Sequence, residues 1–383
     1  RVHAAGVSMR LLSILYLRCR SVVFMNNLSV NEINGEPFDV FRSDHIIIKN
    51  NKIISDKTGI YIYEYTRNIL VEGNDLQSSV STVSIRLRDG EPGTMENITI
   101  RDNTTRGIIQ LNATILRNIN IINNTASKLI ITPRGETNEV SNIVIENNMF
   151  TSPGRNVEIQ IGESISVRNN KLQNAVYAVN VGKLLIESNS VACKTTDFCT
   201  GVQIDGNVDA VIRSNHIKDT TYQGILIRNA VGTNNRRIEI IDNVIDTSAT
   251  ICGAGCPAIR VAGTDYAVVM LNRTLNTNGN QSISVDPPGV VMYNIVDKPI
   301  YAPLAFIKFN RGYATENSGV ATIPSGSTRT TVNHGLVKAP TKVLVTPYAN
   351  IRVWVENITS TSFDIVTDTA PTSDTNVAWY AEV

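Results

Sequence analysis

The chain has 383 residues, a formal net charge of +1 and 18% charged residues. Nucleic-acid-binding proteins carry an excess of basic residues gathered in a stripe, and this nearly neutral chain has no such excess, so we expect no nucleic-acid partner. No apolar run reaches the ~18 residues of a transmembrane helix, so we expect no membrane insertion. Ile, Val, Asn and Thr are abundant while aromatic residues make up only 6%, which is typical of β-rich proteins.

An apolar segment at residues 9–17 has two interpretations. It is either the core of a signal peptide or an incoming strand of a first repeat, in a chain that begins within a repeat. Arg18 and Arg20 follow it at once and no small-residue cleavage site is present, which favours the strand. The sequence does not tell whether the N-terminus is truncated.

One pattern recurs from residue 46 onward. Each copy is an eight-residue stretch with apolar residues at its first, third and eighth positions and Asn at its sixth, as in Ile46, Ile48, Asn51 and Ile53. Later copies place this Asn at Asn74, Asn103, Asn124, Asn148, Asn170, Asn189, Asn215 and Asn243. The spacing averages about 24 residues, which indicates a solenoid.

The residue types in the repeat decide between two solenoids. Leucine-rich repeats have this period but use Leu and a helical return, whereas here the apolar residues are Ile and Val and the returns are strand-like. We therefore predict an all-β fold, a right-handed parallel β-helix over residues 1–288, with each Asn at a bend, stacked on the Asn of the next turn.

The outer face of the Asn-containing strand carries two columns. One alternates in charge and is interpreted as a structural ladder: Lys49, Glu72, Arg101, Ile122, Glu146, Arg168, Glu187, Arg213 and Ile241. The other is an apolar strip of Ile47, Leu70, Val144, Leu185 and Val211. An outward apolar strip predicts a covered face, so we expect packing against other copies of the chain.

A second strand in each repeat, often opened by Gly, has a polar outer column. Its members are Tyr61, Arg86, Gln110, Gln160, Asn180, Gln203, Leu226, Arg260 and Ser284. Neighbours two residues on include Tyr63, Arg88, Asn112, Asp205 and Arg228. Long amide and guanidinium side chains over a flat sheet suit sugar hydroxyls, so we identify Tyr61, Tyr63, Arg86, Arg88, Gln110, Gln160, Asn180, Gln203 and Arg260 as candidate ligand-binding residues; ordinary solvated sheet surface is the alternative.

The repeat is lost near Pro287 and Pro288. We interpret residues 289–318 as a cap and linker, and residues 319–383 as a small β-sandwich that serves trimerisation or binding, because short alternating strands separated by turn residues fill this last region.

The five cysteines include two close pairs. We expect disulfides between Cys193 and Cys199 and between Cys252 and Cys256, which fit an extracellular or thermostable protein. Cys19 is left over. A zinc site is the alternative, but no His lies nearby, so neither a metal nor a cofactor is expected.

Catalytic residues are harder to identify. Glycoside hydrolysis needs two facing carboxylates, and Asp205 is expected beside Arg228 rather than beside a second acid. Glu158 and Asp89 are further candidates, and Arg86, Arg88 and Asp89 could supply the cation and the base that β-elimination of a uronate needs. The sequence does not decide whether the chain is an enzyme; if it is, we expect a polysaccharide lyase or glycoside hydrolase.

The repeat of residues 46–286 resembles the pectate-lyase-like superfamily of parallel β-helices, although the Asn-Thr-Asp, Asp-Asp and Gly-His-Gly patterns of polygalacturonases are missing. Segments of the C-terminal region, including residues 319–326, 331–336 and 379–382, resemble small β-modules that end phage and archaeal-virus tail proteins. The resemblance implies a tailspike-like homotrimer on a virion surface or outside the cell that binds or degrades polysaccharide. The alternatives are a secreted pectate-lyase-type enzyme working alone and a purely structural solenoid, and the sequence does not name a glycan.

Overall fold

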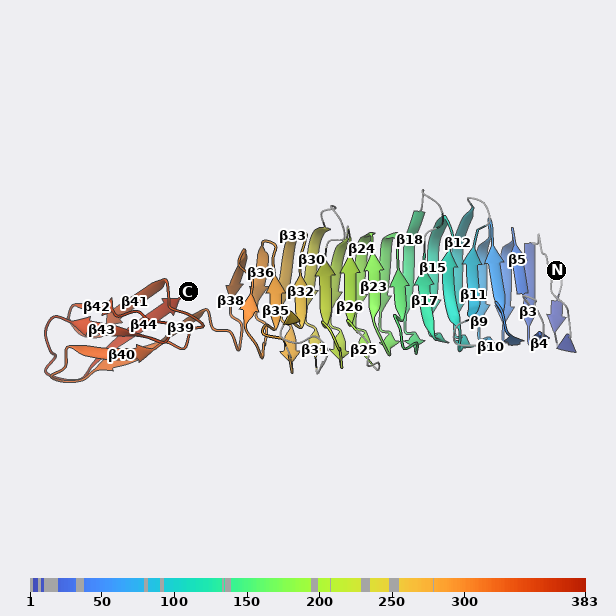
Figure 1. Ribbon diagram of the computed structural model, residues 1–383. Helices are drawn as coiled ribbons and strands as arrows, with labels where there is room; N and C mark the ends of the chain where they lie inside the picture. The colour runs from blue at the N-terminus through green and yellow to red at the C-terminus, as the bar shows by residue number, and fades with distance from the viewer. Residues whose placement is uncertain are drawn as a thin grey trace.

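The computed structural model describes residues 3–5, 8–9, 20–31, 38–78, 82–89, 93–132, 134, 139–193, 199–206, 208–228, 235–247, 255–277 and 279–383. The strands stack side by side along one axis as far as β38, and the strands from β39 to β44 form a separate smaller unit at the C-terminal end (Figure 1). Most of the apolar segment 9–17 and Cys19 lie outside the described residues.

Three parallel sheets make up the solenoid, and successive turns add one strand to each. Sheet A comprises β1 (His3–Ala5), β3 (Arg20–Met25), β6 (Asp44–Lys49), β9 (Arg67–Glu72), β12 (Thr94–Arg101), β15 (Ile115–Ile122), β18 (Glu139–Glu146), β21 (Gly162–Arg168), β24 (Val181–Glu187), β27 (Asp209–Arg213), β30 (Asn235–Ile241), β33 (Thr264–Met270), β36 (Gly289–Met292) and β38 (Ala305–Lys308).

Sheet B has the shortest strands. It comprises β2 (Ser8–Met9), β4 (Leu28–Asn31), β7 (Lys52–Ser55), β10 (Asp75–Gln77), β13 (Thr104–Thr105), β16 (Thr125–Ala126), β19 (Met149–Phe150), β22 (Lys171–Leu172), β25 (Ser190–Ala192), β28 (His216–Lys218), β31 (Val244–Asp246) and β34 (Arg273–Leu275). The sequence did not predict this sheet, because strands of two to four residues show no periodicity of their own.

Sheet C contains the strands that were predicted to carry the polar column. It comprises β5 (Phe38–Phe41), β8 (Ile60–Tyr63), β11 (Val83–Arg88), β14 (Ile108–Asn112), β17 (Lys128–Ile131), β20 (Val157–Ile159), β23 (Val176–Val179), β26 (Val202–Asp205), β29 (Ile225–Arg228), β32 (Ile259–Val261), β35 (Ile283–Val285) and β37 (Ile300–Tyr301).

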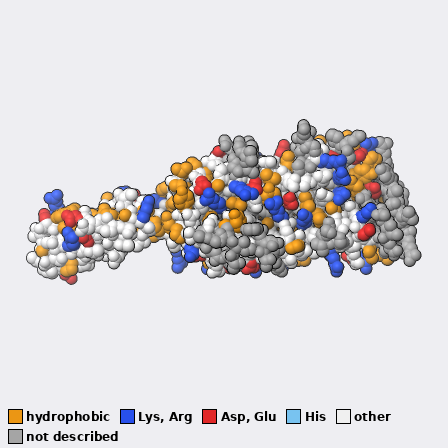
Figure 2. Space-filling view, viewed as in Figure 1, with side chains coloured by type: hydrophobic (Ala, Val, Ile, Leu, Met, Phe, Trp, Pro, Cys, Tyr) orange, Lys and Arg blue, Asp and Glu red, His pale blue; other side chains and the backbone are white. Residues whose placement is uncertain are grey.

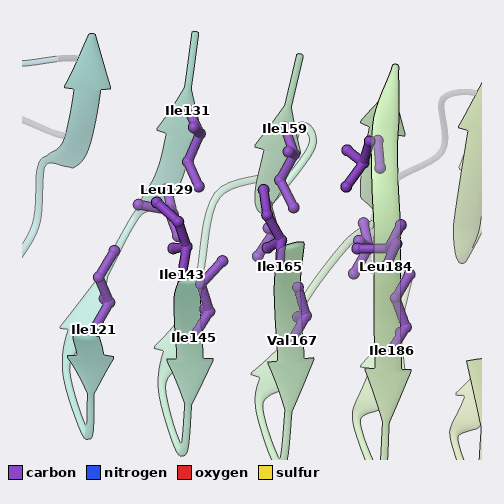
Figure 3. Packing of buried hydrophobic residues seen from close by; sticks show 14 of the residues in the cluster. Ile121, Leu129, Ile131, Ile143, Ile145, Ile159, Ile165, Val167, Leu184 and Ile186 are labelled. Atoms are coloured by element: carbon purple, nitrogen blue, oxygen red, sulfur yellow. The ribbon is translucent and has the colours of Figure 1, made fainter. Parts of the chain in front are cut away.

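The core lies inside the coil, where alternate residues of every strand point. Ile143 and Ile145 of β18 and Ile165 and Val167 of β21 are at most 2% exposed, and they pack on the aliphatic side chains of the turns before and after (Figure 3). Each turn therefore buries its apolar face only because its neighbours cover it.

The predicted Asn ladder is confirmed and is longer than expected. In the middle of it, Asn148 Nδ2 donates to Asn170 Oδ1 at 3.0 Å, and both the backbone N and the Nδ2 of Asn124 donate to Asn148 Oδ1 at 2.8 and 3.0 Å. The same bonds link Asn27, Asn51, Asn74, Asn103, Asn124, Asn148, Asn170, Asn189, Asn215, Asn243, Asn272, Asn294 and Asn310.

The expected end of the β-helix at residue 288 is too early. Strands β36 and β38 continue sheet A, and β37 continues sheet C, so much of the segment 289–318 belongs to the solenoid. The end of the β-helix was predicted too early because Thr274 occupies an apolar position of the repeat. This Thr is buried and donates to Asp297 Oδ1 at 3.1 Å, which satisfies a hydroxyl that would otherwise be costly there.

The C-terminal unit consists of two antiparallel three-stranded sheets. One has the order β39 (Glu316–Ile323), β44 (Thr375–Glu382) and β41 (Lys342–Pro347), and the other β40 (Arg329–Asn333), β43 (Ser362–Thr367) and β42 (Val353–Glu356). They enclose a core that includes Phe363, Ile365 and Val377. Lys308 of the last solenoid strand pairs with Glu316 at 3.1 Å and Glu382 at 3.5 Å, and so ties this module to the β-helix.

One predicted disulfide, between Cys193 and Cys199, is present. The second pair includes Cys252, which lies outside the described residues.

Candidate functional site

The register of sheet C corrects the polar column predicted from the sequence. Hydrogen-bonded neighbours align Tyr61, Arg86, Gln110, Ile130, Glu158, Tyr177, Gln203, Leu226, Arg260 and Ser284. Gln160 and Asn180 were expected in this column, but Glu158 and Tyr177 take their places. Asn180 follows β23 at a bend, with a φ of 53°, because the strand comes earlier in the chain than its Val-Asn-Val segment suggested.

Asp205, on β26, is the best-anchored acid of this face. It is 3% exposed, and Arg228 of the next strand grips both of its oxygens, Nε at 2.7 Å and Nη2 at 3.2 Å. Gln203 Nε2 donates to Oδ2 at 2.8 Å. The expected pairing of Asp205 with Arg228 is therefore observed, and it fixes the guanidinium at the surface.

The electrostatics of this cluster favour holding a ligand over moving a proton. Burial and the negative charge of Asp205 raise the pKa of Tyr177, so the phenol stays protonated at neutral pH and is a poor general base. The hydrogen bond with Asp205 raises the pKa of Arg228. Donors occupy both oxygens of Asp205, so this carboxylate is not placed to act as a general acid.

Arg155 lies over Tyr177. Its Cζ is 3.5 Å from the ring centroid, and its Nη1 is 4.0 Å from Glu158 Oε1, which also accepts from Gln160 Nε2 at 3.0 Å. Around this stack lies a groove of about 430 Å³, lined among others by Tyr177, Tyr222, Gln203 and Arg228. It combines an aromatic ring, an amide and guanidinium groups.

The N-terminal part of sheet C carries a second group, which we call the aromatic platform: Phe41, Tyr61, Tyr63, Arg86 and Arg88. The Tyr61 and Tyr63 rings are stacked with centroids 4.9 Å apart, and Phe41 lies 4.7 Å from Tyr63. Arg86 lies beside Tyr61 on the neighbouring strand, with its Cζ 5.8 Å from that ring centroid, and Nε donates to Gln110 Oε1 at 3.1 Å. Arg88 is the register partner of Tyr63.

The remaining candidates have local partners. Arg260 donates to Ser284 and to Asp286 Oδ2 at 2.8 Å. Asp89 is 1% exposed and accepts from the backbone N of Thr114, so it anchors a turn and does not face solvent.

The candidate acids do not form a catalytic pair. Glu158 and Asp205 lie on β20 and β26, with β23 between them, so their strands are ~10 Å apart. Hydrolysis requires two available carboxyl groups, and the oxygens of Asp205 are occupied.

The residues that the structure describes contain no helix long and apolar enough to span a membrane, and they bring no three His, Cys, Asp or Glu side chains together as metal ligands.

Sequence reasoning missed Tyr177, Arg155 and Tyr222. The alternation of Val176 and Ala178 about Tyr177 is the signal that could have identified β23 and its outward ring. Arg155 and Tyr222 lie between strands, where no periodicity places them.

The sheet A face confirms the predicted charge ladder and places the apolar strip in one column. Lys49 and Arg101 pair with Glu72 at 3.2 and 3.1 Å, and Arg168 pairs with Glu146 at 2.8 Å. Ile47, Leu70, Val144, Leu185 and Val211 share one register position, interrupted by Thr99, Asn120 and Ser166. On the side of the solenoid that Figure 2 shows, which is not the sheet A face alone, basic, acidic and apolar side chains are interspersed.

Residues 13–129 match a family described as the right handed beta helix region. No curated protein sequence matches the chain. Among solved structures, the chain is similar to the tailspike gp61 of Pseudomonas phage phi297, with a TM-score of 0.42 and 13% sequence identity, covering 96% of this chain and 67% of that one.

Two further solved structures were determined with saccharide. The Gp54 tailspike of Acinetobacter baumannii bacteriophage AP22, in complex with capsular saccharide, has a TM-score of 0.39 and 12% identity, covering 92% and 70% of the two chains. A mutant tailspike of E. coli bacteriophage HK620, in complex with a pentasaccharide, has a TM-score of 0.42 and 11% identity, covering 95% and 71%. In fold, the present chain is a right-handed parallel β-helix that carries a small antiparallel β-module at its C-terminal end.

Proposed function

We propose that the chain is a tailspike-like polysaccharide-binding protein, which holds an extended glycan along the outer face of sheet C. The observation that carries the proposal is the groove around Tyr177. A half-buried ring offers an apolar surface to a sugar, while Gln203 and Arg228 present donors held in place by Asp205. Ligand sites combine apolar walls with a few well-placed polar groups in this way.

The function that we propose is polysaccharide binding without cleavage. Among the described residues, the candidate acids supply no pair of available carboxylates, and the raised pKa of Tyr177 keeps its phenol protonated. The Cys193–Cys199 disulfide supports a location in an oxidising environment, outside the cell or on a virion surface.

The proposal also includes a homotrimer formed through sheet A. The apolar strip borders a shallow groove of about 670 Å³ lined by Val144, Leu185 and Val211, with charged residues such as Lys183, Asp209 and Arg237 around it. An apolar strip rimmed by charges of both signs suits a second copy of the same surface. Packing of three chains through this face would leave sheet C open to a glycan.

A glycan array with the full chain tests the proposed binding, with product analysis on every hit. Tyr177→Ala should weaken binding about fivefold, since an aromatic contact contributes about 1 kcal/mol. Lys171→Ala, an exposed position on sheet B, is the matched control and should bind like the unmodified protein. Equal binding by all three proteins would remove the groove from the proposal, and shortened oligosaccharides would extend it to an enzyme.

Light scattering tests the trimer. The full chain should have three times the chain mass, and deletion of residues 319–383 should weaken the assembly. A monomer mass for the full chain would instead favour the stand-alone secreted protein.

A further inference from the structure

The four arginines on the strands of sheet C fall into two classes. Arg228 is neutralised by Asp205 at 2.7 Å and Arg260 by Asp286 at 2.8 Å. Arg86 and Arg88, both on β11, form no ion pair with any residue that the structure describes: Arg86 contacts an amide and an aromatic ring, and Asp89, next to Arg88 in sequence, is buried and bonded to Thr114. Among the described residues, these two guanidinium groups on one strand therefore have no ion-pair partner.

The position of these two side chains indicates what they face. Both are half-buried and point outward from the sheet, about 7 Å apart along the strand. Across the register they meet the stacked rings of Tyr61 and Tyr63. The nearest acid of the same column, Asp39, lies on β5, beyond Tyr61.

Guanidinium groups bind carboxylates through paired, planar hydrogen bonds, and an aromatic ring beside them accepts the apolar face of a sugar. We propose that the aromatic platform is a subsite for an acidic sugar, and that the glycan bound along sheet C bears carboxylate groups recognised by Arg86 and Arg88. This inference rests on the proposed function and names the substrate class of the same face.

The distance between the aromatic platform and the groove around Tyr177 sets a minimum length for a glycan that contacts both. Strand β11 of the platform and strand β23 of the groove are four strands apart, which corresponds to ~19 Å. A single sugar cannot reach both, so an oligosaccharide spanning several residues should bind more tightly than a monosaccharide.

The test compares three full-length proteins on an array of neutral, carboxylated, and sulfated or phosphorylated glycans. They are the unmodified chain, the double variant Arg86→Gln with Arg88→Gln, and a control, Arg106→Gln, an exposed arginine outside the strands of sheet C. Carboxylated glycans should dominate the hits, and the double variant should bind them about ten- to a hundredfold more weakly. Binding by the unmodified protein should fall as salt rises, and the double variant should lose most of that dependence. Chemical reduction of the carboxyl groups of the glycan should weaken binding by the unmodified protein as much as the double substitution does.

The outcomes separate the two proposals. Hits that are only neutral or only sulfated or phosphorylated, or carboxylated hits bound equally by the double variant, would overturn the acidic-sugar subsite and leave the proposed function standing. The absence of any hit for the unmodified protein would overturn the proposed function, and this inference with it.

Discussion

Replacing Asn148 by alanine tests the stabilising role of the Asn ladder. The side chain is 1% exposed. Its Nδ2 donates to the carbonyl of Ile121 at 2.8 Å, to that of Glu146 at 3.0 Å and to Asn170 Oδ1 at 3.0 Å. Its Oδ1 accepts from the backbone N and the Nδ2 of Asn124. Alanine removes all of these bonds.

The cost follows from the groups left behind. The backbone N–H of Asn124 and the carbonyl of Ile121 lose these partners inside the coil, and each buried unsatisfied group costs about 1–3 kcal/mol. We expect Asn148→Ala to lower the free energy of unfolding by about 3–5 kcal/mol, allowing for lost side-chain bonds and partial relaxation.

Equilibrium unfolding in guanidinium chloride, followed by circular dichroism, measures this change. The matched control is Asn120→Ala, on the outer face of β15, where the side chain is half-exposed; it should shift the midpoint by a small fraction of the Asn148 effect. Equal midpoints for the two variants would refute the assignment of the ladder as a main stabilising element.

Three further predictions concern stability. Ile145→Asp places an unpaired carboxylate at a fully buried position and should yield insoluble protein; soluble protein with unchanged melting would contradict the core assignment. Partial desolvation of its carboxyl group opposes ionisation of Asp297, but hydrogen bonds from Thr277, Ser282 and Thr274 outweigh it and lower its pKa. Its stabilising contribution should therefore be complete above the unfolded value of ~4, and lost as pH falls through the lower folded value. Unfolding midpoints measured against pH should show less of this acid loss in Asp297→Asn, and identical profiles would exclude the role. Leu271 has a φ of 59° and is 54% exposed, so Leu271→Asn should raise the free energy of unfolding by about 1 kcal/mol; a lower melting temperature would show that the leucine makes a contact that compensates.

The solenoid could be predicted because every turn of the coil has to meet the same physical requirements. Ile46 and Ile48 must face inward, and Asn51 must satisfy the backbone at the bend of every turn, so both appear in the sequence at regular spacing. Sheet B could not be recognised, since strands as short as Thr104–Thr105 leave no alternation. The true end of the solenoid was missed because a hydrogen bond to Asp297 allows Thr274 to fill an apolar slot.

The candidate site was predictable only in outline. A polar column was expected on the outer face of sheet C, and the expected contact of Asp205 with Arg228 is observed. Tyr177 was missed because loops of unequal length separate the strands, and an error of three residues in one strand removes its outward side chain from the column. Pairing between strands, which sets that register, is a property of the folded coil.

Hydroxyl-radical footprinting of tyrosines, with and without a polysaccharide selected on the array, tests the central claim most directly. Bound polysaccharide should protect Tyr61, Tyr63, Tyr177 and Tyr222, which lie on or beside sheet C. It should leave exposed tyrosines elsewhere, Tyr266, Tyr293 and Tyr348, oxidised as before. Protection of Tyr266 or Tyr293 without protection of Tyr177 would contradict the assignment of sheet C as the binding face.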